Sequence, residues 1–155
     1  MLTEGDILPD FTLATAEGGA LHLGQLGRPL ILYFYPKADT PGCTTEAIDF
    51  SERKAAFDMA GASIVGVSRD EPKAIGKFVA KHALKIVLAS DTDGALSDAF
   101  GTWGEKSMYG KTYMGMERAT VLVGTDGRIA RIWRKVKVPG HAEAVLEATR
   151  ALAAE

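Results

Sequence analysis

The chain has 155 residues, of which 46% are hydrophobic and 25% charged, as in an ordinary soluble globular domain. Its net charge of −2 argues against a nucleic-acid-binding protein that depends on phosphate neutralisation, and its longest strongly apolar run, PLILYFYP, is about a third of a membrane span. The N-terminus does not resemble a secretory signal, and the one cysteine, Cys43, cannot form an internal disulfide, so we expect a cytoplasmic protein that does not act on membranes.

The first half of the chain alternates predicted strands with a predicted helix. The stretch DFTLATAEGGALHL alternates apolar and polar residues around a turn at 17–19, which predicts a hairpin of two short strands. The continuous apolar run at 29–35 is bounded by prolines and predicts a strand that is covered on both faces. A helix is then expected at about 42–59, followed by a second buried strand at 62–68.

The second half continues the alternation and ends with a hairpin and a helix. The pattern predicts a helix at 71–82, a strand at 86–89, a short helix at 93–100, a long loop at 101–117, strands at 119–123 and 129–133, and a helix at 140–153. Strand-helix-strand units imply parallel pairs, and the Asp126-Gly127 turn adds an antiparallel pair. We therefore expect one α/β domain over residues 1–155, with a mixed central sheet flanked by helices and an N-terminal β-hairpin.

Cys43 follows Thr40-Pro41-Gly42 at the expected start of a helix. The unpaired amides of a first helical turn and the helix dipole both favour a thiolate there. Lowering a thiol pKa from about 8.5 to about 6 takes about 3.4 kcal/mol, whereas a dipole contributes about 0.3–1 and at most about 2 kcal/mol. A nearby cation is therefore expected if Cys43 is reactive. The alternatives are that Cys43 is a small buried hydrophobe and that Thr40 is only a helix cap.

The string YPKADTPGCTTEA resembles the active-site pattern of peroxiredoxins, in which a proline, three residues, a threonine and two residues precede a cysteine. The fuller string is similar to the Q-type subfamily, also called the bacterioferritin comigratory protein subfamily. The similarity extends to GDILPDFTL near the start and to WGEKSMYGKTYMGMERATVLV at 103–123. The resemblance implies a thioredoxin-like fold and an enzyme that reduces hydrogen peroxide and organic hydroperoxides without a cofactor.

The resemblance also implies roles for five residues. Cys43 would be the peroxidatic cysteine, and Thr40 would hydrogen-bond its thiolate and the attacked peroxide oxygen. Pro36 would shield the pocket, and the first-turn amides, with Gly42 among them, would bind the substrate. The family's arginine corresponds to Arg118, which would supply the expected cation; the alternative is a surface arginine at a strand start.

The chain departs from many Q-type relatives at position 48. Those relatives carry a resolving cysteine five residues after the peroxidatic one, where this chain has Ile48. We therefore expect a one-cysteine cycle in which an external thiol, thioredoxin or glutaredoxin with glutathione, reduces the sulfenic acid of Cys43. A second subunit could also resolve it, and the expected state is a monomer or weak homodimer. The alternatives are a redox sensor or holdase with little turnover, and a glutathione peroxidase-like enzyme.

Other motifs carry less weight. The three histidines are scattered and form no metal-like cluster, so no metal site is expected. Gly110-Lys111-Thr112 resembles the end of a phosphate-binding loop, but Glu105 stands where that loop needs a glycine. The aromatic and methionine residues of the predicted loop at 101–117 either pack against the sheet edge or form a wall of the peroxide pocket or a docking surface for a partner.

Overall fold

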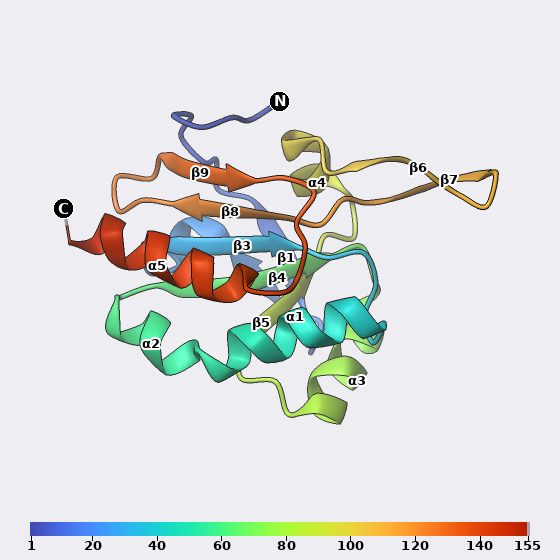
Figure 1. The fold of residues 1–155 in the computed structure, drawn as a ribbon, viewed down its shortest axis with the longest axis horizontal. Coiled ribbons are helices and arrows are strands. Elements are labelled where there is room, and N and C mark those ends of the chain that lie inside the picture. Colours follow the sequence, from blue (N-terminus) through green and yellow to red (C-terminus); the bar gives the residue numbers. More distant parts are fainter. Residues whose placement is uncertain (155) are drawn as a thin grey trace.

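A seven-stranded mixed sheet forms the centre of the computed structural model, which describes residues 1–154 (Figure 1). The strand order is β2-β1-β5-β4-β3-β8-β9. The strands are β1 (Thr12–Thr15), β2 (Ala20–His22), β3 (Leu30–Phe34), β4 (Ser63–Ser68), β5 (Val87–Ser90), β8 (Ala119–Val123) and β9 (Ile129–Trp133). Strands β3, β4 and β5 pair in parallel, whereas β1–β2, β1–β5, β3–β8 and β8–β9 pair antiparallel. The predicted mixed sheet and N-terminal hairpin are confirmed.

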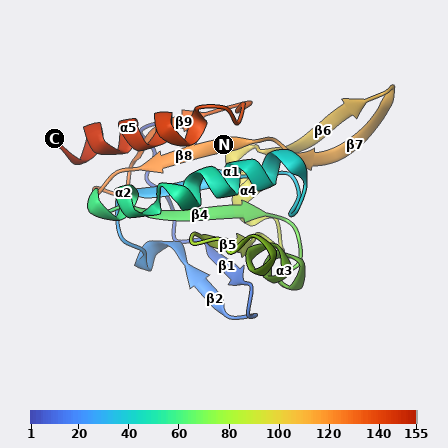
Figure 2. The same ribbon diagram turned by 60° about the horizontal axis from the view of Figure 1, so that its bottom comes forward.

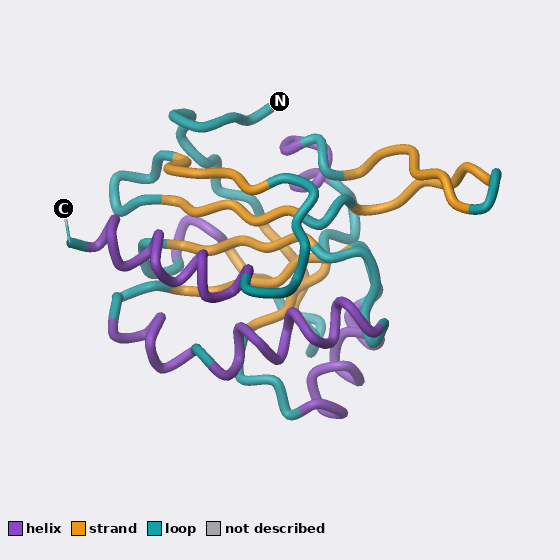
Figure 3. Tube along the Cα trace, in the orientation of Figure 1, coloured by secondary structure: helices purple, strands orange, loops and turns teal. Residues whose placement is uncertain are grey.

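Helices cover both faces of the sheet, and α1, α2 and α5 lie in front of it in Figures 1 and 3. The helices are α1 (Pro41–Glu52), α2 (Lys54–Met59), α3 (Pro72–His82), α4 (Ala95–Phe100), α5 (His141–Ala153) and a short 3₁₀ helix (Leu23–Gln25). Along β3, Ile31 and Tyr33 belong to the core on the α1 side, and Leu30 and Leu32 belong to the core on the other side. This central strand is therefore buried on both faces, as its apolar sequence predicts.

The helix expected at 42–59 is divided into α1 and α2. Arg53 separates them with φ −102° and ψ 5°, and its N–H group donates to the carbonyl groups of Phe50 and Ser51. Helical bonding resumes when the amide of Phe57 donates to the carbonyl of Arg53. No glycine or proline occurs near this break, so the sequence gives no local signal for it.

The segment expected to be a loop at 101–117 is largely a β-hairpin, so that prediction is wrong. Strands β6 (Trp103–Met108) and β7 (Lys111–Met116) pair in register and project away from the main sheet (Figures 1 and 2). Tyr109 and Gly110 form the turn with φ values of 51° and 75°, a conformation that suits a tight hairpin. The base is anchored because Met116 is fully buried and Trp103 packs against the core. The four glycines of residues 101–117 concealed the strand pattern in the sequence.

No helix in residues 1–154 is both long enough and apolar enough to cross a membrane.

Candidate active site

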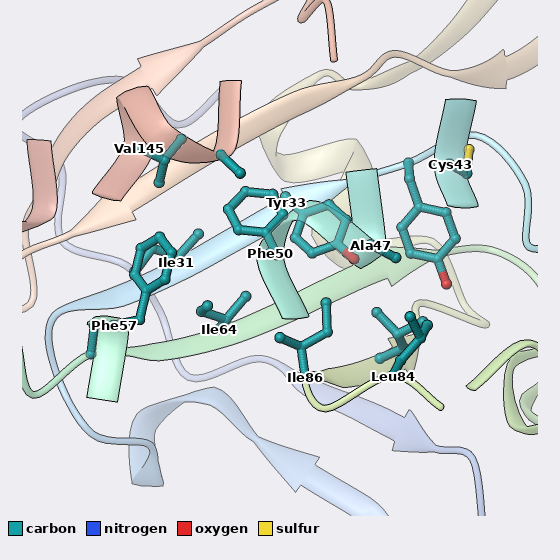
Figure 4. Close-up of a cluster of buried hydrophobic side chains, with 14 of the residues drawn as sticks. Ile31, Tyr33, Cys43, Ala47, Phe50, Phe57, Ile64, Leu84, Ile86 and Val145 are labelled. Atoms are coloured by element: carbon teal, nitrogen blue, oxygen red, sulfur yellow. The ribbon is translucent and has the colours of Figure 1, made fainter. Parts of the chain in front are cut away.

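The cysteine lies in the first turn of α1, just beyond the carboxyl end of β3. Cys43 is the third residue of the helix, its side chain is only 1% exposed, and it lies at one end of the core cluster (Figure 4). The amide of Thr44 donates to the carbonyl of Thr40 at 2.9 Å, which closes the first turn. Amides earlier in the helix have no intrahelical acceptor and add partial positive charge near the sulfur.

The connection between β3 and α1 carries the two other residues of the predicted motif. Thr40 has the extended backbone of an N-cap residue, but its hydroxyl donates to the carbonyl of Lys37 at 2.7 Å and makes no cap hydrogen bond. The interpretation of its side chain as a helix cap is therefore wrong. Pro36 is half-buried and follows Tyr35, whose amide donates to the carbonyl of Val67 at 3.0 Å. The structure thus places Pro36 and Thr40 in the loop that leads to Cys43.

Arg118 supplies the cation that the sulfur was expected to need. It directly precedes β8, whose first residue, Ala119, is paired with the last residue of β3. This register brings the arginine to the start of α1 from a point 75 residues further along the chain, and its Nη2 lies 3.5 Å from the Sγ of Cys43. Partial burial disfavours the charged form of the guanidinium. The charges of Glu46 and Cys43 and their hydrogen bonds to Arg118 favour that form more strongly, so the pKa of Arg118 is raised.

Glu46 was not identified from the sequence, although it lies three residues after Cys43 and so on the same face of α1. Its Oε1 accepts a hydrogen bond from Nη1 of Arg118 at 2.7 Å, and its side chain is 1% exposed. Its Oε2 is buried and has no hydrogen-bond partner among the described residues. Burial raises the pKa of Glu46 to about 7, because the opposing effect of Arg118 offsets it only in part. The i, i+3 spacing from the cysteine is the signal that could have found it.

Gly42 leaves room for the arginine. A Cβ atom at this position would lie 3.1 Å from Nη2 of Arg118, which is tight enough to displace the guanidinium. A hollow of about 440 Å³ borders the same arginine, between the base of the β6–β7 hairpin and the segment that follows β9, and its lining includes Lys106 and Lys135. Solvent can therefore reach the guanidinium from the side of the hairpin.

The remaining sequence candidates have other partners. Nε2 of His141 lies 2.7 Å from Oγ1 of Thr120, and Nε2 of His82 lies 2.9 Å from a carboxylate oxygen of Asp39. Lys111 begins β7 at the exposed tip of the hairpin, where no helix follows it. Across residues 1–154, no group of three or more His, Cys, Asp or Glu side chains could hold a metal ion.

Comparisons with known proteins agree on one protein family. A family model described as the AhpC/TSA family matches residues 5–132. A protein named peroxiredoxin Bcp from Xanthomonas campestris is 51% identical over 143 residues, which is 92% of this chain and 89% of that protein. Peroxiredoxin Bcp from Bacillus subtilis is 43% identical over 144 residues, or 92% of both chains.

A solved structure gives the same result for the fold. The bacterioferritin comigratory protein of Xanthomonas campestris, described in connection with alkyl peroxide reduction, matches with a TM-score of 0.86 and 47% identity. The match covers 92% of each chain. The fold of this chain is therefore similar to that of the Xanthomonas campestris protein over most of its length.

Proposed function

The chain belongs to the AhpC/TSA family and is a Q-type peroxiredoxin with a thioredoxin-like fold, and from this we propose that it is a thiol-dependent peroxidase that acts through Cys43. The observation that carries the proposal is the Arg118 guanidinium, 3.5 Å from the only sulfhydryl of the chain at a helix N-terminus. The alkyl peroxide reduction attributed to the Xanthomonas campestris protein supports organic hydroperoxides, together with hydrogen peroxide, as substrates. These relatives do not favour a redox sensor or a holdase.

The first step is a displacement at oxygen. The Cys43 thiolate attacks the terminal oxygen of the hydroperoxide, the S–O bond forms as the O–O bond breaks, and the leaving oxygen takes up a proton as alcohol or water. Arg118 and the first-turn amides, including that of Gly42, stabilise the charge that develops on the two oxygens. Thr40 hydrogen-bonds the reacting oxygen, and Pro36 limits the access of water.

The second step needs a thiol from another molecule. The chain has no second cysteine, and Ile48 occupies the place of a helix resolving cysteine. An external thiol condenses with the sulfenic acid, releasing water, and a second thiol then reduces the mixed disulfide and regenerates Cys43. Thioredoxin and glutaredoxin with glutathione are the reductants we propose, acting on a cytoplasmic monomer or weak homodimer.

A peroxidase assay against separate thiol reductants tests this function. Peroxide consumption should be sustained with at least one of thioredoxin, glutathione or glutaredoxin with glutathione, and intact mass should show one added oxygen on Cys43 after peroxide alone. The Cys43→Ser variant should consume no peroxide. Full activity in Cys43→Ser, or rapid oxidation of the wild type that no reductant turns over, would contradict the proposal.

A further inference from the structure

The site contains two acids that depend on one cation. Arg118 donates through Nη1 to Glu46 and through Nη2 to Cys43, so a single positive charge faces a carboxyl group and a thiol. Glu46 and Cys43 are each 1% exposed, which keeps water from solvating a second negative charge. Within the described residues, no other cation lies within ion-pair distance of Glu46.

Among residues 1–154, the other titratable groups around Cys43, Glu46 and Arg118 form no second ion pair with Glu46. Burial raises the pKa of Tyr33 well above its usual value, and burial lowers the pKa of His141 to about 4, so both side chains are neutral at pH 7. The surrounding set also includes Tyr35, which directly follows β3, Asp49 on α1 and Lys106 on β6. Tyr35 is held neutral by burial, and Asp49 adds negative charge near Glu46. Burial and the charge of Arg118 lower the pKa of Lys106, Cys43 and Glu117 oppose them, and Lys106 makes no ion pair with Glu46.

The two oxygens of Glu46 differ in a way that shows where a proton belongs. Oε1 is paired with the guanidinium, while Oε2 is buried and has no donor among residues 1–154. A buried anionic oxygen without a donor costs much more free energy than a buried neutral hydroxyl. Protonation of Oε2 therefore removes the least favourable charge of the site and leaves the hydrogen bond from Arg118 to Oε1 in place.

We propose that Cys43 and Glu46 share one proton under the single charge of Arg118, so that the thiol ionises as the carboxylate takes up a proton. Glu46 is thus a positioning residue that sets the charge of the site, and this role rests on the proposed peroxidase function of Cys43. The exchange leaves the net charge of Cys43, Glu46 and Arg118 together unchanged.

Sharing has a consequence for the peroxide step. Conversion of the thiolate to a neutral sulfenic acid leaves Arg118 with no anion, so Glu46 releases its proton and becomes the partner of the guanidinium. The leaving oxygen needs one proton. In the balanced step, the thiolate, the carboxylic acid and the hydroperoxide react to give a sulfenic acid, a carboxylate and an alcohol. The leaving oxygen receives the proton of Glu46, so no proton is taken from the medium.

Proton uptake measures this directly. Reduced protein is mixed with one equivalent of hydrogen peroxide in weak buffer containing a pH indicator, slightly above neutral pH, and sulfenic acid is quantified by mass. Wild type and Glu52→Gln, a control at an exposed glutamate of the same helix, should take up close to no protons. Glu46→Gln should take up about one proton for each sulfenic acid, because a glutamine has none to release. Uptake of about one proton by the wild type would overturn the proposal.

Two further measurements separate sharing from simple support of Arg118. The pH profile of Cys43 alkylation should move down by about one pH unit or more in Glu46→Gln, because the guanidinium then serves the thiolate alone. A residue that only held the arginine in place would move the profile up when replaced. In isotope-edited infrared spectra at neutral pH, the carboxylic acid band of Glu46 should be strong in the reduced wild type and weak in Cys43→Ser. An unchanged band in Cys43→Ser would contradict sharing.

Neither of these two readouts needs turnover. If the protein has no peroxidase activity but its alkylation profile and infrared band behave as described, the proposed function is refuted and the shared proton is supported. An active peroxidase whose profile does not respond to Glu46→Gln would retain the proposed function and refute the sharing.

Discussion

Glu46 and Arg118 form an ion pair at the start of α1, with 2.7 Å between Oε1 and Nη1. The glutamate is 1% exposed and the arginine 17%, so water screens this pair less than an exposed one. The pair joins a residue of the first helix to a residue that precedes β8, and thereby fixes the guanidinium against Cys43.

Replacing Arg118 should therefore affect both rate and stability. We expect Arg118→Ala to slow oxidation of Cys43 by hydrogen peroxide about 10²–10³-fold, the loss typical when one charge-stabilising donor is removed. The variant should also lose about 1–3 kcal/mol of unfolding free energy because Glu46 loses its partner. Rapid-mixing kinetics and urea unfolding measure the two effects. Arg118→Lys should recover part of the rate, and Arg150→Ala, an exposed arginine on α5, should change neither quantity. An oxidation rate in Arg118→Ala within a factor of about two of the wild type would contradict the role of Arg118.

The raised pKa of Glu46 predicts a pH dependence of stability. Its value of about 7 lies above the ordinary value of 4.5, so the folded state holds this proton more tightly than the unfolded state. The resulting stabilisation is complete below about pH 4.5 and is lost as the pH rises to about 7. The stability of Glu46→Gln relative to the wild type should therefore increase across this range by up to about 3 kcal/mol and then level off. Denaturant unfolding at several pH values, with Glu52→Gln as the control, measures this stability difference. A difference between Glu46→Gln and the wild type that does not change with pH would contradict the titration of Glu46.

The titration of His141 should change the pH dependence of stability in the opposite direction. Burial and the nearby Arg118 and Arg131 lower its pKa to about 4 from an ordinary value of 6.5, so the folded state disfavours its proton. The wild type should lose stability as the pH falls from about 6.5 to about 4. In His141→Gln this loss should be smaller, although the variant should be less stable at pH 7 because the ring contacts with Phe50 and Trp133 are removed. Parallel stability curves for the two proteins would show that His141 does not titrate as described.

Much of the fold was predictable because the apolar pattern is strong where strands are buried on both faces. The run at 29–35 became β3, and the proline-marked start after Thr40 became α1. The position of Arg118 beside the sulfur followed from the family resemblance and not from spacing, because the β3–β8 pairing brings together Cys43 and Arg118, which are 75 positions apart. Prediction therefore worked where the information was local or where the family pattern supplied the distant partner.

The missed features depend on tertiary contacts. The division at Arg53 has no glycine or proline to announce it, and the β6–β7 hairpin is held at its base by contacts of Trp103 and Met116 with the core. Glu46 resembles any other helix glutamate until the approach of Arg118 and its own burial are known. That the domain extends over the whole chain stays a prediction.

Thr40 offers a test of the loop before α1. Thr40→Val keeps the shape of the side chain and removes the hydroxyl that donates to Lys37, so it should lose about 1 kcal/mol of stability. If the same hydroxyl turns to the peroxide during reaction, as proposed, oxidation of Cys43 should also slow about 10²-fold. Thr40→Ser should stay close to the wild type in both respects. A stability loss without any slowing would limit Thr40 to a structural role, which unfolding and stopped-flow measurements on the same samples distinguish.

Ile48 determines how the oxidised enzyme can be resolved. It lies five residues after Cys43 in α1, is half-buried and packs against the core cluster that contains Cys43. In an ideal helix the two Cα atoms would be about 8.6 Å apart and turned about 140° from each other, whereas a disulfide needs less than about 7 Å.

The variant Ile48→Cys should therefore form an internal disulfide after peroxide only if the first turns of α1 unwind. We expect peroxide-treated Ile48→Cys to lose both thiols and part of its helical circular dichroism, and to regain both on reduction. Ile48→Ser controls for the lost side chain, which should cost about 1–2 kcal/mol in either variant. The serine variant should keep its helix on oxidation and still need an external thiol. A sulfenic or overoxidised Cys43 beside a free cysteine at 48 would show that α1 is too stable here to unwind, and that a resolving cysteine requires further changes in this helix.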